Sequence, residues 1–167
     1  QLVVDACTAA NNAGVDFSKY DTDGDSEIDH LLILFSGNGQ NWYGRDTSLN
    51  TGPDDDAGAN DYARDLVWPS RLYTSSGFGT YDGISIKTAT INPEDPDFNL
   101  PIGVTCHEFG HDLGLPDLYD TGGATEGIGD WGLMGAGNYT SPFSPSRMEA
   151  WSLNELGWVT LRPITVA

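Results

Sequence analysis

The chain has 167 residues, enough for one domain with a hydrophobic core, and 38% of these residues are apolar. It carries 25 Asp and Glu against 7 Lys and Arg, so its formal net charge is -18. A surface this acidic repels phosphate backbones and anionic lipids, which argues against nucleic-acid binding and membrane association and favours metal cations. No apolar run in the sequence is long enough to span a bilayer.

The first predicted elements are a helix, an acidic loop and a strand. An Ala-rich segment over residues 2–13 predicts a short helix that Gly14 ends. The acidic loop covers residues 21–29, and the apolar run "HLLILFS" at 30–36 predicts a fully buried strand. Residues 37–63 are rich in Gly, Asn and Asp and predict a long surface excursion, with an exposed acidic triplet at 54–56.

The later elements are two strands, two helices and an irregular stretch. Residues 65–72 and 83–91 predict strands, and residues 101–113 predict a helix. Residues 121–138 are Gly-rich and irregular, and residues 144–156 predict a second helix. The residues expected to bound these helices are Asn99, Pro101, Gly114, Ser144 or Ser146, and Gly157.

The acidic loop "DTDGDSEIDH" predicts a cation site. Acidic side chains recur at alternate positions, namely Asp21, Asp23, Asp25, Glu27 and Asp29. Carboxylates this close repel one another unless a cation binds, and the spacing is that of a Ca²⁺ loop. Ser26 stands where such a loop usually has Gly, and Leu32 where it has Glu, so a helix-loop-helix hand is not expected. The alternative is a solvated acidic turn.

The stretch "CHEFGHDLGLPD" contains two of the three histidines, His107 and His111, four residues apart. On a helix such residues share a face, so both rings can hold one ion. Glu108 completes the H-E-x-x-H pattern of two zinc ligands and a general base. The alternative is a solvated helix that carries two histidines by chance.

A catalytic zinc ion takes a third protein ligand and leaves one position open for water. Gly114 can turn the chain back after the helix, and Asp117 then has the best spacing to reach the metal. Asp120 follows the same turn and is the nearest alternative. Two further alternatives are His30 and Glu149.

Met134 follows downstream in "WGLMGAGNY", and H-E-x-x-H-x-x-G-x-x-D with a later methionine resembles the metzincin metallopeptidases. More narrowly, "GVTCHEFGHDLGLPDLYDT" and "GDWGLMGAG" resemble the immune inhibitor A family of secreted bacterial metallopeptidases. The blocks "FSKYDTDGDSEIDHLLILFSG" and "AWSLNELGWV" extend this likeness over most of the chain. The resemblance implies a zinc endopeptidase with ligands His107, His111 and Asp117, the base Glu108, Met134 beneath the metal, and a Ca²⁺ loop.

The resemblance also implies an α+β, metzincin-like fold in a single catalytic domain, 1–167. A mixed twisted sheet and the active-site helix would form an upper lobe (1–117), and a small, irregular lower lobe (118–167) would complete a cleft for an extended peptide. It implies a secreted protein that acts on protein or peptide substrates with Zn²⁺ and Ca²⁺ as cofactors. We expect a monomer, and a chain that starts at Gln1 suggests a mature or excised piece of a longer product.

Several roles stay open at this point. Tyr139, just past Met134, is a candidate donor to the oxyanion of the reaction. Cys7 and Cys106 can form a disulfide if the protein is secreted, and two reduced core thiols are the alternative. The competing functions are a calcium-stabilised binding or adhesion module with structural zinc, and a metallohydrolase that acts on substrates other than peptides.

Overall fold

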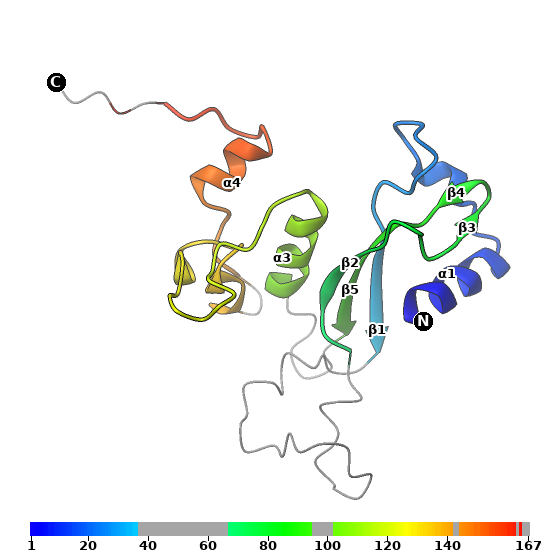
Figure 1. Ribbon diagram of the computed structural model, residues 1–167, viewed down its shortest axis with the longest axis horizontal. Helices are drawn as coiled ribbons and strands as arrows, with labels where there is room; N and C mark the ends of the chain where they lie inside the picture. The colour runs from blue at the N-terminus through cyan, green and yellow to red at the C-terminus, as the bar shows by residue number, and fades with distance from the viewer. Residues whose placement is uncertain (37–66, 95–101, 142–143, 163, 165–167) are drawn as a thin grey trace, which may run out of the picture. The chain divides into compact units, whose positions relative to one another are not determined.

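The computed structural model describes residues 1–36, 67–94, 102–141, 144–162 and 164 (Figure 1). The chain divides into two compact units, Gln1–Leu100 and Pro101–Ala167, which we describe separately. The predicted excursion at 37–63, its acidic triplet and the predicted helix start at Asn99 and Pro101 lie outside the described residues. Within the described ranges, no helix is long and apolar enough to cross a membrane.

The first unit begins with helix α1 (Leu2–Asn12), as predicted for residues 2–13. Its buried side chains, Val3 and Cys7, are four residues apart and therefore share one face. This helix lies beside the hairpin of β3 (Thr80–Tyr81) and β4 (Ile84–Ser85) (Figure 1). The hydroxyl of Tyr81 fixes the contact, because it lies 3.0 Å from the Thr8 hydroxyl and donates to the carbonyl of Val4 at 3.4 Å.

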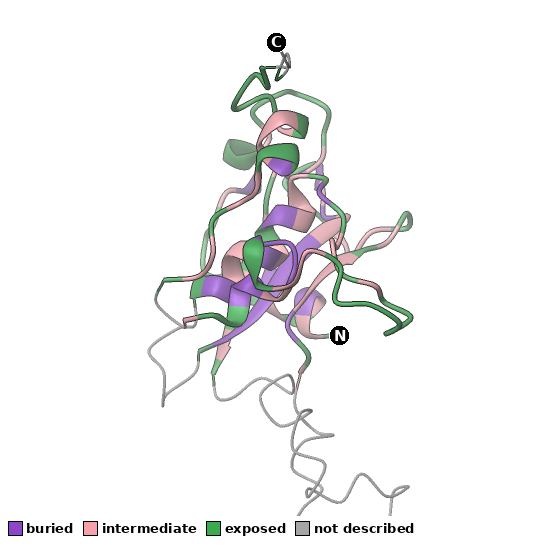
Figure 2. Ribbon diagram, turned by 90° about the vertical axis from the view of Figure 1, so that its left-hand side faces the viewer, coloured by how far each residue is buried: buried purple, intermediate pink, exposed green. Residues whose placement is uncertain are grey.

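The main sheet of the first unit is mixed. Its order is β1 (Leu32–Ser36), β5 (Thr88–Glu94), β2 (Ser70–Tyr73), with β1 parallel and β2 antiparallel to β5. The central strand β5 is buried from Ala89 to Pro93, as the colouring in Figure 2 shows. The core of this unit consists of Val3, Cys7, Phe17, Ile28, Ile84, Ile86, Ala89 and Ile91.

Three strand predictions need correction. The strand predicted at 83–91 is two strands, β4 and β5, because Phe78 donates to the carbonyl of Ile86 and the chain changes partners there. The predicted strand 30–36 is not fully buried, since Leu32 is 46% and Leu34 48% exposed. Its counterpart β1 pairs with β5 only, among the strands that the structure describes. In the strand predicted at 65–72, residues 67–69 lie before β2 and are not part of a strand.

The second unit contains α3 (Ile102–Asp112), two 3₁₀ turns, η3 (Gly129–Trp131) and η4 (Ala136–Tyr139), and α4 (Ala150–Glu155). Helix α3 agrees with the prediction, and the Gly-rich stretch is irregular as expected. The unit and the first one together give a mixed α/β composition with a small mixed sheet and few helices. The lobe boundary predicted after Asp117 stays a prediction, and the two units divide before α3.

The helix predicted at 144–156 is shorter at its start. The amide of Ser146 donates to the Gly137 carbonyl at 2.9 Å, and the Arg147 carbonyl accepts from the Leu133 amide at 3.2 Å. These long-range hydrogen bonds hold the segment against the Gly-rich stretch, so it cannot join a helix. The N-cap is therefore Glu149 rather than Ser144 or Ser146, and its carboxylate accepts from the amide of Ser152 at 2.8 Å.

Candidate metal centre

Helix α3 places His107 and His111 one turn apart on the same face, with ring centroids 4.7 Å apart. His107 is only 4% exposed. Gly110, on the inner side of the helix, makes room for Met134, since a Cβ at this position would lie 2.5 Å from the Met134 sulfur. Met134 is fully buried against this helix, as a methionine beneath the metal would be.

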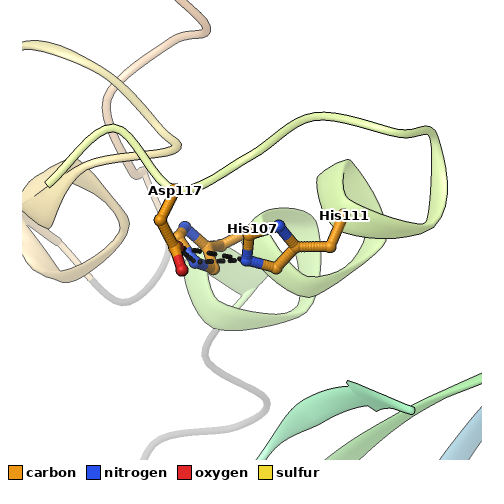
Figure 3. Close-up of side chains that lie close together, drawn as sticks. All are labelled: His107, His111 and Asp117. Carbon is orange, nitrogen blue, oxygen red and sulfur yellow. Dashed lines mark hydrogen bonds and ion pairs between the residues drawn. The ribbon is translucent and has the colours of Figure 1, made fainter. Parts of the chain in front are cut away.

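The chain turns back after α3 at Gly114, whose φ of +96° is readily adopted only by glycine. The Gly114 amide donates to the His111 carbonyl and the Leu115 amide to the Gly110 carbonyl, both at 3.0 Å. This tight return brings Asp117 back to the two imidazoles. Figure 3 shows its carboxylate pointing at the rings of His107 and His111.

The three ligand atoms form a nearly equilateral triangle. The Asp117 Oδ1 lies 3.1 Å from the Nε2 of His107 and 3.1 Å from the Nε2 of His111, and the two Nε2 atoms are 3.2 Å apart. In a tetrahedral zinc site with bonds of 2.0–2.1 Å, ligand atoms are about 3.3–3.4 Å apart. The separations of the histidine–aspartate cluster (His107, His111 and Asp117) are close to these values.

Each imidazole is held through its other nitrogen. The Nδ1 of His107 donates to the Leu133 carbonyl and the Nδ1 of His111 to the Leu115 carbonyl, both at 2.8 Å. In a neutral imidazole this leaves the Nε2 without a proton and free to bind a metal. Burial lowers the pKa of His107, which disfavours the charged imidazolium.

The Asp117 Oδ1 is buried and has no hydrogen-bond partner. It therefore faces two nitrogen lone pairs, an arrangement that is repulsive until a cation binds between them. A divalent metal ion with nitrogen and oxygen ligands fits this donor set. The described part of the chain offers one group of His and acidic side chains that contains both histidines, and its third member is Asp117.

The segment that contains Met134 supports two of the three ligands through its backbone. The Leu133 carbonyl accepts from His107, as described above, and the next carbonyl, that of Met134, accepts from the Leu118 amide at 2.8 Å. Leu118 directly follows Asp117, so adjacent carbonyls fix one histidine and the loop that carries the aspartate.

The alternative third ligands are not members of the histidine–aspartate cluster in the part of the chain that the structure describes. The Asp120 carboxylate accepts from the backbone amides of Gly122 at 2.8 Å and Ala124 at 2.9 Å, which lowers its pKa. Glu149 caps α4, and His30 belongs to the first unit. The structure thus brings Asp117 to the histidines, in agreement with the spacing argument.

Tyr119 is a site residue that the sequence reasoning missed. Its ring is stacked with that of His107, with centroids 6.4 Å apart and planes inclined by 16°. Burial, the hydrogen-bonded carboxylate of Asp117 and the charge of Glu108 raise the pKa of Tyr119 to about 12, so the phenol keeps its proton at neutral pH. The available signal was its position two residues after Asp117, because alternate residues of an extended segment point to the same side.

The acidic loop brings together three of its five predicted ligands. Asp21, Asp23 and Asp29 each offer an oxygen, and these oxygens lie within 4.8 Å of one another. Asp25 and Glu27 are not members of this group, and the Glu27 carboxylate instead pairs with the ammonium of Lys87.

Backbone hydrogen bonds shape this loop. The Asp21 carboxylate accepts from the amides of Gly24 at 2.8 Å, Asp25 at 3.1 Å and Ser26 at 3.0 Å. The Asp29 Oδ2 accepts from both the amide and the hydroxyl of Thr22, at 3.1 and 2.5 Å. Since these donors partly neutralise the carboxylates, the acidic loop is less dependent on a cation than the histidine–aspartate cluster.

The two cysteines are free thiols in the structure, one in each unit. Cys7 is buried in the core of the first unit, and Cys106 is half-buried on α3. Burial raises the pKa of each thiol, which makes both less reactive. The disulfide predicted between them stays a prediction.

Comparison with known proteins agrees with this geometry. Residues 10–162 match the family model described as immune inhibitor A peptidase M6, catalytic domain. Immune inhibitor A of Bacillus thuringiensis subsp. alesti is 33% identical over 182 residues, which is 89% of this chain and 24% of that protein. The pre-pro-metalloprotease PrtV of Vibrio cholerae serotype O1 is 30% identical over 141 residues, or 77% of this chain and 13% of PrtV.

The chain thus spans about a quarter or less of the length of these curated relatives. The family match covers most of the chain and includes α3, the return turn and the Met134 segment. The resemblance inferred from the sequence is confirmed: this chain belongs to the immune inhibitor A peptidase M6 family, to whose catalytic domain it corresponds.

Proposed function

We propose that this domain is a zinc-dependent endopeptidase that hydrolyses peptide bonds in protein substrates. The observation that carries the proposal is the histidine–aspartate cluster, in which ligand atoms from the H-E-x-x-H helix and from the loop after it lie within 3.2 Å of one another. Membership of a peptidase family supports the same reaction. A secreted protein is proposed because PrtV, to which this chain is similar, is named as a pre-pro-metalloprotease.

Zinc bound by His107, His111 and Asp117 would supply Lewis acidity, which makes a water molecule nucleophilic near neutral pH. Glu108 lies next to His107 on α3, and its carboxylate accepts a proton from the water as this attacks the peptide carbonyl. The same carboxylate then passes the proton to the leaving amine nitrogen. The Leu133 and Leu115 carbonyls keep both imidazoles in the tautomer that leaves Nε2 available. Tyr139 stays our candidate for the donor to the oxyanion.

The acidic loop is proposed to bind Ca²⁺ and to stabilise the first unit. The convergence of Asp21, Asp23 and Asp29 supports this, and Asp25 and Glu27 are the weaker members of the predicted set. A hard cation with oxygen ligands suits such a group.

The competing binding-module function requires structural zinc, which usually has four protein ligands. Only three ligands converge in the described ranges, which leaves a position for water. The metzincin-like arrangement of two lobes and the monomeric state remain part of the proposal.

The decisive experiment is Glu108→Gln, with Glu155→Gln on the exposed side of α4 as the matched control. Loss of the general base should lower casein hydrolysis by about 10²–10⁴-fold, whereas zinc content stays at one ion per chain. The control should keep both. Persistent hydrolysis in the Gln variant would refute the role of Glu108, and activity on small esters but not on casein would favour the non-peptide hydrolase.

A further inference from the structure

The orientation of the Asp117 carboxylate needs an explanation beyond the metal. Its Oδ1 lies 3.1 Å from both imidazole Nε2 atoms, although the residue lies on a loop after α3 and its side chain is 27% exposed. A carboxylate on a loop can rotate about its side-chain bonds, and each rotation away from the rings costs metal affinity. Metal ligands are commonly held by a hydrogen bond to a neighbouring group.

Tyr119 is placed to provide that hydrogen bond. Its phenol lies close enough to the Asp117 carboxylate for the two groups to interact electrostatically. Leu118, between the two, is fixed from both sides, because its amide donates to the Met134 carbonyl at 2.8 Å and its carbonyl accepts from the Ile128 amide at 2.9 Å. Asp117 and Tyr119 therefore extend from a backbone that is anchored at the residue between them.

The ring of Tyr119 contacts a second ligand. It is stacked with the His107 imidazole, whose other nitrogen donates to the Leu133 carbonyl. One side chain thus interacts electrostatically with the aspartate and stacks its ring on a histidine.

We propose that Tyr119 is a positioning residue for the metal centre: its O–H holds the Asp117 carboxylate with Oδ1 toward the histidines, and its ring restrains His107. This inference rests on the proposed zinc site. A phenol has one proton to donate, and Tyr119 gives it to Asp117, which leaves the oxyanion role to another donor.

The test is Tyr119→Phe, which removes the hydroxyl and keeps the stacked ring. Zinc affinity, measured by competition with a chromophoric chelator, should fall by about 10–100-fold. The visible spectrum of the Co²⁺-substituted protein should change, because the carboxylate ligand is reoriented. Tyr20→Phe, the same change at an exposed tyrosine of the first unit, should leave both readouts at the wild-type level.

A double-mutant cycle with Asp117→Asn tests whether Tyr119 acts through the aspartate. In that background Tyr119→Phe should lower zinc affinity by less than twofold, since the carboxylate is already absent. The metal-free Tyr119→Phe protein should unfold at the wild-type temperature, because the hydroxyl serves the ligand and not the core.

Three results would overturn the inference. Zinc affinity could be unchanged in Tyr119→Phe, or Tyr119→Phe could lower zinc affinity as much in the Asp117→Asn background as in the wild type. The third is a lower unfolding temperature of the metal-free Tyr119→Phe protein. The proposed function fails separately. If the wild-type chain binds no zinc, both the proposed function and the role of Tyr119 are refuted. If the wild type binds zinc and cleaves casein, and Tyr119→Phe has wild-type zinc affinity, only the role of Tyr119 is refuted.

Discussion

The histidine–aspartate cluster and the acidic loop are both candidate metal sites, but their ligands are prepared differently. In the cluster, each histidine is held at Nδ1 by a carbonyl, and the Asp117 Oδ1 is buried without a hydrogen-bond partner. In the loop, the converging carboxylates are half-buried or exposed, and those of Asp21 and Asp29 accept hydrogen bonds from amides of the loop itself. The Asp117 Oδ1 of the cluster is therefore available to a metal ion, whereas hydrogen bonds already compensate much of the negative charge of the loop carboxylates.

This difference has an energetic meaning. A buried oxygen among nitrogen lone pairs is costly without a cation, so the cluster should bind its metal tightly and lose its geometry when the metal is removed. Exposed carboxylates with amide donors can persist in water, so the loop should bind its cation weakly and survive its removal. Changes at the cluster should therefore have larger effects than changes at the acidic loop.

His111→Ala removes one of the two imidazoles of the cluster, and no other His or acidic side chain among the described residues joins this group besides Asp117. Zinc affinity should fall by more than about 100-fold, because even a residue that only contacts a ligand contributes about 10–100-fold. Metal analysis after dialysis and a chelator competition assay would measure this. His30→Ala, which changes the histidine of the first unit, should retain zinc, and loss of zinc there would restore His30 as a ligand.

Gly110→Ala tests the packing beneath the cluster. The added Cβ would lie 2.5 Å from the Met134 sulfur, so the variant should lose about 1–3 kcal/mol of stability through overpacking. Chemical denaturation would measure the loss. Combined with Met134→Ala, the substitution should cost less than the sum of the two single changes, and strict additivity would argue against this contact.

Calcium should have a modest effect on the acidic loop. At one hundred times its dissociation constant, Ca²⁺ would stabilise the wild-type protein by about 2.7 kcal/mol, seen as a rise in Tm. Asp21→Asn should abolish the rise and lower the calcium-free Tm only slightly, since the amide oxygen can still accept from Gly24 and Asp25 although the hydrogen bond from Ser26 is lost. Asp130→Asn, an exposed change in the second unit, should keep the calcium response. A wild-type Tm that ignores Ca²⁺ would identify the loop as a solvated turn.

The smallest effect concerns Asp29, whose pKa is lowered chiefly by the hydroxyl and amide of Thr22. A carboxylate with a depressed pKa stabilises the fold above its unfolded value of about 3.9 and loses this contribution as pH falls through the folded value. Thr22→Val should raise the pKa of Asp29 toward the ordinary value, as a carbon NMR titration would show. Asp16, whose pKa is lowered by Ser18, is an internal control and should titrate unchanged.

The sequence predicted those parts of the site that depend on short spacing. His107 and His111 share a helical face, and Gly114 sets the return of Asp117, so the ligand set follows from residues within one stretch. The sequence analysis did not predict Tyr119, because the metal-binding motif does not include it. Its position two residues after Asp117 does place it on the same side of an extended segment.

What the sequence could not predict depends on distant partners. Glu27 is not among the converging carboxylates of the acidic loop, because it pairs with Lys87, 60 residues away. Residues 146 and 147 hydrogen-bond to the Gly-rich stretch instead of continuing α4 toward the N-terminus. The composition predicts that Leu32 and Leu34 are buried, but they alternate with Ile33 and Phe35 and lie on the more exposed face of β1. Each of these wrong predictions depends on tertiary packing, which local sequence patterns do not encode.

The adjacent carbonyls of Leu133 and Met134 couple the ligands to one another. One carbonyl orients an imidazole and the next anchors the loop beside the aspartate, so a displacement of the Leu133–Met134 backbone would disturb both at once. The geometry needed for metal coordination would then be lost at both ligands together and not at one ligand at a time. Substitutions that distort this stretch should lower both metal affinity and the proposed peptidase activity, although none of its side chains is a proposed metal ligand.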